Sequence, residues 1–277
     1  MTPAADDSIA PLDTEAETEI LNRGEIEVRG RIMPASNATF LAQVTLDGVG
    51  IECVYKPVAG ERPLWDFPDG TLGRREVAAY AISEAMGWHV VPSTVLRGDG
   101  PVGIGMLQAW REPDPEQDPV DLVPAGRLPE GYLHVLDALD GTDRPVSLVH
   151  EDSEALRRMC VFDIVVNNAD RKGGHVLAMT DGHRFGVDHG LSFNVEDKLR
   201  TVLWGWAHEP LHVDDAAAVR SLAEQLRASD SDLTAVLSEL LSADEVAVTV
   251  ARCEALLRRG QMPRPSGGRP SIPWPAF

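Results

Sequence analysis

Residues 167–175 read NNADRKGGH, and residues 186–190 read GVDHG. Between these polar segments lie two short apolar runs around Asp181-Gly182, a strong signal for a two-residue hairpin turn. Counting outward from that turn, His175 opposes Asp188, and directly opposed Cβ atoms lie about 5 Å apart. The stretch therefore predicts a hairpin that brings an imidazole and a carboxylate together beside a Gly-rich turn.

Three side chains of this stretch, Asp170, His175 and Asp188, have the chemistry of a polar active site. Imidazole and carboxylate groups both bind divalent cations, and Asp170 adds a second carboxylate in the adjacent turn. The alternative interpretation is a surface hairpin with ordinary Asp and His residues.

The composition favours a folded chain with one large domain or two lobes. It has 277 residues, of which 43% are hydrophobic, as in globular proteins. Asp and Glu number 44 against 25 Lys and Arg, which gives a net charge of −19. Contacts to phosphate need clustered Lys and Arg, so binding to nucleic acid or stable association with an anionic membrane is not expected.

The cysteines and the amino terminus indicate a cytoplasmic protein. Cys53, Cys160 and Cys253 lie in apolar runs without Cys-x-x-Cys spacing, which predicts buried free thiols in a reducing compartment. The first residues lack the basic and apolar regions of a signal peptide, and no apolar run is long enough to span a membrane. Residues 1–18 are acidic and are predicted to be flexible.

A second Asp-Gly pair, Asp47-Gly48, predicts another hairpin. A two-residue turn pairs Val44 with Ile51 and brings Thr39 opposite Lys56. A longer loop would slip this register. The preceding turn contains small polar residues whose backbone N–H groups, together with the Lys56 ammonium, could hold a phosphate; a plain hairpin is the alternative.

The rest of the chain divides by composition. We expect residues 19–111 to form a strand-rich unit, 112–130 an acidic Pro-rich connector, 131–260 a mainly helical unit, and 261–277 a Pro/Gly-rich tail that is either disordered or packed by Trp274. Ser153 is expected to cap a helix that runs to the Asp170 turn. Apolar spacing predicts a short helix followed by a strand over residues 19–31. It predicts further helices over 74–86, 132–139, 216–226, 233–241 and 243–257, further strands over 40–46, 51–57, 90–96 and 103–110, and a loop over 141–149.

Asp170-Arg171, the polar residue five positions after Asp170, and Asp188-His189-Gly190 resemble the site pattern of atypical kinases. The pattern is similar to that of phosphatidylinositol 3-/4-kinase-like proteins and of HipA-type kinases. The resemblance covers about residues 33–206 and implies a catalytic role for Asp170 and a metal-binding role for Asp188. His175 stands where the family usually has a metal-binding Asn.

The amino-terminal half carries further elements of the resemblance. Residues 54–57, VYKP, are similar to the strand that carries the ATP-binding lysine, here Lys56. Ser36 and Asn37 lie where the family places a phosphate-covering loop. In kinases a helix glutamate holds this lysine on the phosphates, which implies that Glu76 pairs with Lys56.

The glutamate partner of Lys56 and the contacts to adenine complete the predicted nucleotide site. Glu84 could pair with the lysine instead of Glu76, or neither glutamate could do so. By analogy with the kinase hinge, backbone groups from Gln108 to Trp110 would face adenine.

The resemblance implies an α+β, two-lobed protein-kinase-like fold with a strand-rich N-lobe and a mainly helical C-lobe. It implies an ATP-dependent phosphotransferase that uses Mg²⁺ or Mn²⁺ and an unidentified lipid, protein or small-molecule hydroxyl as acceptor. Ordinary protein kinases are disfavoured because no Ala-Pro-Glu signature follows the hairpin. The alternatives are a nucleotide-binding pseudokinase that acts as an interaction module and a kinase-fold AMP transferase.

Overall fold

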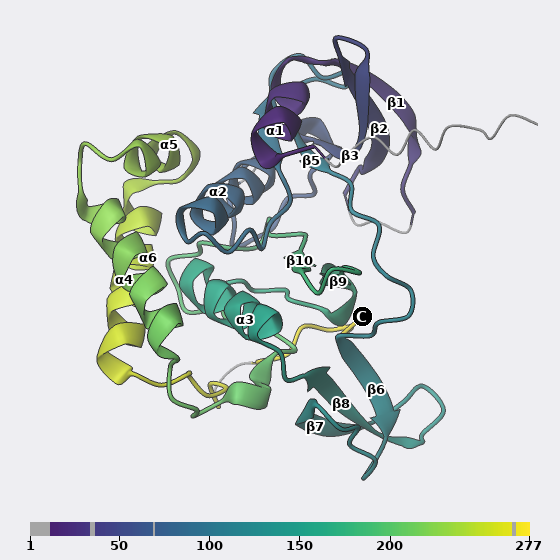
Figure 1. The fold of residues 1–277 in the computed structure, drawn as a ribbon, viewed down its shortest axis with the longest axis vertical. Helices are drawn as coiled ribbons and strands as arrows, with labels where there is room; N and C mark the ends of the chain where they lie inside the picture. Colours follow the sequence, from purple (N-terminus) through teal and green to yellow (C-terminus); the bar gives the residue numbers. More distant parts are fainter. Residues whose placement is uncertain (1–11, 34–36, 69, 268–269) are drawn as a thin grey trace, which may run out of the picture.

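A computed structural model describes residues 12–33, 37–68, 70–267 and 270–277. The described chain is α+β, with antiparallel sheets and six α-helices. A five-stranded sheet lies at one end of the molecule and a three-stranded sheet at the other, with helix α3 and a short hairpin between them (Figure 1). The five-stranded sheet has the order β1-β2-β3-β5-β4, with β1 at Glu25–Arg31, β2 at Phe40–Leu46, β3 at Val49–Pro57, β4 at Thr94–Arg97 and β5 at Gly105–Ala109.

The β2–β3 hairpin has the register that its turn predicts. Val44 pairs with Ile51, and the pairing continues to Phe40 opposite Tyr55. Asp47 and Gly48 both have positive φ, 50° and 84°, as a type I′ turn requires. The turn thus fixes the position of Lys56, the next residue along β3.

Helix α1 begins earlier than predicted. It spans Thr14–Arg23, and the Asp13 side chain caps it by accepting a hydrogen bond from the backbone N–H of Ala16 at 2.8 Å. The prediction that residues 1–18 are flexible is therefore wrong for this part, because Ile20 and Leu21 anchor the helix in the core beneath the five-stranded sheet.

The segment after the five-stranded sheet differs most from its prediction. Strands β6 (Val120–Pro124), β7 (Tyr132–Leu139) and β8 (Pro145–Glu151) form an antiparallel sheet of order β6-β8-β7. The helix predicted over residues 132–139 and the loop predicted over 141–149 are wrong, and β6 interrupts the connector predicted over 112–130. Short apolar runs do not distinguish a helix from a strand by spacing alone. The segment forms strands because β8 pairs with β6 along one edge and with β7 along the other.

The remaining helices agree well with the apolar spacing. Helix α2 spans Leu72–Ala85, and Ser153 caps α3 by accepting a hydrogen bond from the N–H of Leu156 at 3.2 Å. Ser242 and Glu245 form a capping box at the start of α6. The larger core cluster lies among these helices. The bounds are Glu154–Val166 for α3, Val213–Arg227 for α4, Asp232–Leu240 for α5 and Ala243–Arg259 for α6. Single 3-10 turns lie at Val58–Gly60, Gly173–His175 and Trp204–Trp206.

The three cysteines are free and buried, as predicted, and burial raises the pKa of Cys53 and Cys253 to about 12. The tail does not pack through Trp274, whose side chain is exposed; Ile272 and Ala276 contact the core instead. Among the described residues, no helix has both the length and the apolar character needed to cross a bilayer.

Candidate functional site

The predicted central hairpin is present, with a register that differs by one residue. It consists of β9 (Val176–Ala178) and β10 (Arg184–Gly186), and Ala178 pairs with Arg184. His175 therefore opposes Val187, whose N–H donates to the His175 carbonyl at 3.0 Å. The predicted opposition of His175 and Asp188 is wrong, because the turn has more than two residues.

The two side chains nevertheless meet. Asp188 has a left-handed backbone conformation, with φ at 63°, just beyond the paired residues. Its Oδ2 lies 3.4 Å from His175 Nε2. The backbone bend at Asp188 thus restores the contact that the strand register alone would not give.

Lys56 joins this pair to the five-stranded sheet. Its Nζ donates to Glu76 Oε1 at 2.8 Å and to Asp188 Oδ1 at 2.9 Å. Burial acts to lower the pKa of Lys56, but the two carboxylates together raise it well above its ordinary value. Lys56 also holds the pKa of Asp188 well below its usual range. Both groups are therefore charged at neutral pH.

Glu76 is the buried centre of this cluster, with 2% of its surface exposed. Its second oxygen accepts the backbone N–H of His189 at 2.8 Å. One carboxylate on α2 thus holds both the lysine of β3 and the end of the hairpin. The open choice between glutamates is settled, because Glu84 contacts His89 at 2.9 Å instead.

The hydrogen bonds of His175 determine its tautomer. Nδ1 lies 3.0 Å from the backbone carbonyl of Asp170, which can only accept, so Nδ1 carries the proton. Burial lowers the pKa of His175, although the Asp188 carboxylate opposes this shift. The neutral ring therefore presents the Nε2 lone pair to Asp188. A lone pair facing a carboxylate is unfavourable unless a cation or proton lies between them.

These two groups alone do not make a metal site. Among the described residues, no group of three or more His, Cys, Asp or Glu side chains has an arrangement that could hold a metal ion. Asp188 is about half exposed, at 49%, so further ligands can reach it from outside the protein. At the predicted metal site the protein thus offers one nitrogen and one carboxylate.

Asp170 lies in the turn that leads to the hairpin. Its carboxylate is 3.2 Å from the Lys172 ammonium, and its backbone N–H donates to the Asn168 side chain at 2.9 Å. Burial raises the pKa of Asp170, although Lys172 and His175 act to lower it. A raised pKa makes this carboxylate a better proton acceptor.

A buried ion pair, which was not predicted, holds the turn in place. Arg171 binds Asp163 of α3 through two hydrogen bonds, of 2.8 and 2.9 Å, and both side chains have no exposed surface. The same guanidinium donates to the carbonyls of His175 and Val187 at 3.1 and 3.2 Å. Arg171 thus fixes both sides of the hairpin to α3. The sequence contains one indication of this ion pair, because Asp163 is a charged residue within an apolar helical run.

The tail reaches the same turn. The Gly173 N–H donates to the Ala276 carbonyl at 2.8 Å, and a Cβ atom on Gly173 would lie 2.3 Å from the Phe277 ring. The chain beyond α6 therefore packs directly on Gly173, and a side chain at this position would displace the Phe277 ring.

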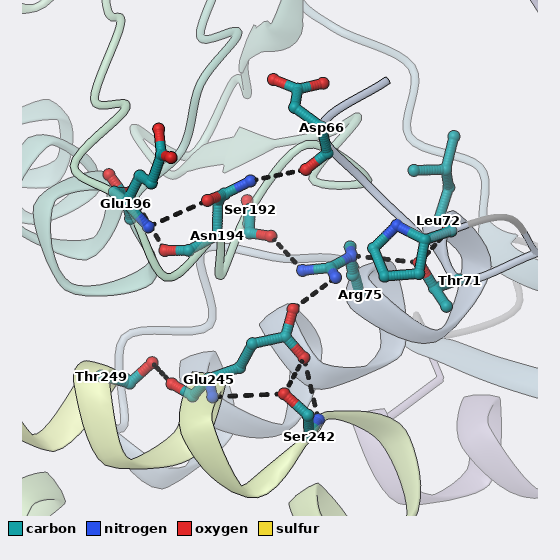
Figure 2. A network of polar contacts seen from close by, with 12 residues as sticks. Asp66, Thr71, Leu72, Arg75, Ser192, Asn194, Glu196, Ser242, Glu245 and Thr249 are labelled. Atoms are coloured by element: carbon teal, nitrogen blue, oxygen red, sulfur yellow. Dashed lines mark hydrogen bonds and ion pairs between the residues drawn. The ribbon is translucent and has the colours of Figure 1, made fainter. Parts of the chain in front are cut away.

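Helix α2 is positioned by a second buried arginine, shown in Figure 2. Arg75 donates to the carbonyl of Ser192 at 2.7 Å and to Glu245 of α6. Its guanidinium also lies 4.9 Å from the centre of the Phe67 ring. Because Arg75 precedes Glu76, this network sets where the Glu76 carboxylate stands.

The other predicted nucleotide-binding residues do not join the cluster through a direct contact. Asn37 accepts the Arg62 N–H at 2.9 Å, which ties it to the loop after β3. Gln108 is buried in the strand between β3 and β4, and its amide donates to Thr94. The Trp110 N–H is taken by the Glu52 carbonyl at 2.9 Å. The backbone of Gln108 and the N–H of Trp110 are thus engaged within the sheet, and Ser36 lies outside the described residues.

Comparison with known proteins gives a family. The sequence is 52% identical over 270 residues to Protein Rv2133c of Mycobacterium tuberculosis (strain ATCC 25618 / H37Rv), and the alignment covers 94% of this chain and 95% of the relative. The chain belongs to the Rv2133c family. No family model matches the sequence. The site described above is therefore the basis for assigning a function.

Proposed function

We propose that this member of the Rv2133c family is an ATP-dependent phosphotransferase with a two-lobed, kinase-like arrangement. The observation that carries the proposal is the contact of Lys56 with both Glu76 and Asp188, at 2.8 and 2.9 Å. A strand lysine, a helix glutamate and a carboxylate after a hairpin have matching roles in kinases, where they hold ATP phosphates and a metal ion.

Each group has a chemical role in this proposal. Lys56 binds the phosphates, and Glu76 orients its ammonium. Asp188 and the Nε2 atom of His175 hold a divalent cation, Mg²⁺ or Mn²⁺, which neutralises phosphate charge. Asp170 accepts the proton of the acceptor hydroxyl, for which its raised pKa is suited. Lys172, at 3.2 Å from Asp170, adds positive charge close to the transferred group.

Catalysis by this arrangement depends on positioning and charge neutralisation. Few covalent changes are needed from the protein in phosphoryl transfer. The rigid supports of the site, the Arg171–Asp163 pair and the Arg75 network, are suited to that requirement.

Calorimetry with ATP and Mn²⁺ or Mg²⁺ tests the placement of the nucleotide. Low-micromolar to millimolar affinity is expected, as is usual for such substrates. Lys56→Ala and Asp188→Asn should each weaken binding at least tenfold. Asp181→Asn in the hairpin turn is the matched control and should bind ATP as the wild type does. Equal affinity in all four proteins would place the nucleotide elsewhere.

Product analysis then separates the three functions that this site could support. Release of ADP identifies phosphoryl transfer, and release of pyrophosphate identifies AMP transfer. Binding without turnover of ATP, over a panel of lipid, protein and small-molecule hydroxyls, identifies a pseudokinase.

A further inference from the structure

A cavity lies away from the Lys56–Asp188 cluster. Its volume is about 970 Å³, and it lies between α6, residues 195–199 and the chain that follows α6. None of the residues that we assign to nucleotide or metal binding lines it. The volume is within the range of small-molecule sites, about 300–1,000 Å³. Apolar side chains form much of the wall, including Val195, Leu199, Val248, Leu256 and Met262.

The charge of this cavity is opposite to that of the whole chain. Three arginines line it, Arg252, Arg259 and Arg264, against one carboxylate, that of Asp197. The protein as a whole has 44 acidic and 25 basic residues. Within the described part of the chain, none of these three guanidiniums has a carboxylate within ion-pair distance, whereas the neighbouring Arg258 pairs with Glu254 at 3.3 Å.

Arg252 has an unmet hydrogen-bonding group. Its Nη2 donates to the carbonyl of Asn194, but its buried Nη1 has no partner among the described residues. Burial lowers the pKa of Arg252 to about 10, and Asp197 only partly opposes this shift. A buried guanidinium N–H without an acceptor is costly, and an anion in the cavity would satisfy it once the Arg252 side chain turns Nη1 toward the cavity.

We propose that this cavity binds an anionic amphiphile, with its charged head at Arg252 and Arg264 and its alkyl chain along the apolar wall. The apolar lining alone would accept many hydrophobic molecules, and the arginines alone would accept any anion. Their combination in one cavity selects a ligand that has both parts. The inference does not depend on the phosphotransferase proposal, since the two sites share no assigned residue.

The ligand would also contact the start of the segment that leads to the hairpin. Asn167 lines the cavity, and its side chain donates to the Asn194 carbonyl at 2.9 Å and accepts the Lys198 N–H at 3.0 Å. Asn167 begins the segment that leads to Asp170. A bound amphiphile would therefore stabilise residues 194–198 against α6.

The proposal is tested by calorimetry of the full chain with octyl phosphate as the probe. The probe is kept below the concentration at which it forms micelles. One-to-one binding is expected, at least tenfold tighter than that of inorganic phosphate, which has the head alone, or of 1-octanol, which has the chain alone. Affinity should rise from butyl to octyl phosphate by up to roughly fourfold for each buried methylene. Octanoate, which carries a carboxylate, shows whether the head must be a phosphate.

Two variants test the position of the head. Arg252→Gln should weaken octyl phosphate binding at least tenfold, the usual effect of losing a charge-assisted hydrogen bond. Arg264→Gln, on the exposed chain after α6, should weaken octyl phosphate binding threefold or more. This variant tests the proposal if Arg252→Gln does not fold. Arg220→Gln on the exposed face of α4 is the matched control and should bind normally. Equal affinity in the three variants, or no binding of octyl phosphate at millimolar concentration, would overturn the proposal.

Discussion

The substitution Arg75→Met tests whether α2 is fixed by its buried arginine. Arg75 is 2% exposed, and the Glu245 side chain that it contacts is 11% exposed, so solvent screens the pair little. Methionine keeps most of the volume beside Phe67 but removes the donors to Ser192 and Glu245. Removing one partner of a buried ion pair costs about 3–5 kcal/mol of folding free energy.

The measurement is thermal unfolding followed by circular dichroism. At roughly 2–4 °C per kcal/mol for a chain of this size, the melting temperature should fall by roughly 6–20 °C. Arg74→Met is the matched control, since Arg74 is the exposed neighbour on α2 and makes one bond, of 3.1 Å, to the Glu239 carbonyl. Its effect should be within about 0.5 kcal/mol.

The pair also predicts how stability depends on pH. Burial acts to raise the pKa of Glu245, but hydrogen bonds from Ser242 and Arg75 lower it overall. The stabilisation is therefore present above the ordinary pKa of 4.5 and is lost as pH falls below it. Without Arg75, the pKa of Glu245 should rise toward its ordinary value, so less stability should be lost as pH falls below 4.5.

A double-mutant cycle with Glu245→Gln gives the result that would refute this reasoning. If Arg75 and Glu245 stabilise the fold through their contact, the coupling energy should exceed about 1 kcal/mol. Equal melting temperatures for Arg75→Met and Arg74→Met, or a coupling near zero, would show that this contact does not hold α2.

Three further predictions concern the turn and the hairpin. Asp170→Asn should leave ATP affinity within about threefold in calorimetry and remove turnover at least a hundredfold, as loss of a general base does; retained turnover would exclude Asp170 as the base. His175→Asn should shift nucleotide binding from Mn²⁺ toward Mg²⁺ and flatten its pH dependence. In the wild type, binding should weaken as pH falls below 6.5 toward the lowered pKa of His175, because proton and metal compete for Nε2; identical titrations from pH 5.5 to 8 would remove His175 from the metal. Gly173→Ala should displace the Phe277 ring and speed proteolysis of the tail, while Gly174→Ala, with open space at its Cβ position, should not; equal digestion would contradict the packing.

Much of the fold follows from local sequence signals. The Asp47-Gly48 turn fixed the register of β2 and β3, because both residues tolerate the positive φ of a type I′ turn. The caps at Ser153 and Ser242 marked the starts of α3 and α6. These interactions lie within a few residues of each other, so the sequence alone carries them.

The three-stranded sheet was not predictable in this way. Strand β7 contains apolar residues at spacings that also suit a helix. Strand β8 follows β7 after a short turn, but its pairing with β6 joins segments that are many residues apart. Only the assembled sheet satisfies the backbone hydrogen bonds and thereby selects the strand.

For the candidate site, the sequence determined the chemical groups, and the tertiary structure decided which of them meet. Lys56, Asp170, His175 and Asp188 were identifiable from motifs, but the hairpin count misplaced the last two by one residue. The left-handed turn at Asp188 brought them together, and a helix from another part of the chain supplied Glu76. Spacing in the sequence limits which side chains can meet locally, whereas contacts across more than a hundred residues depend on packing of the whole fold.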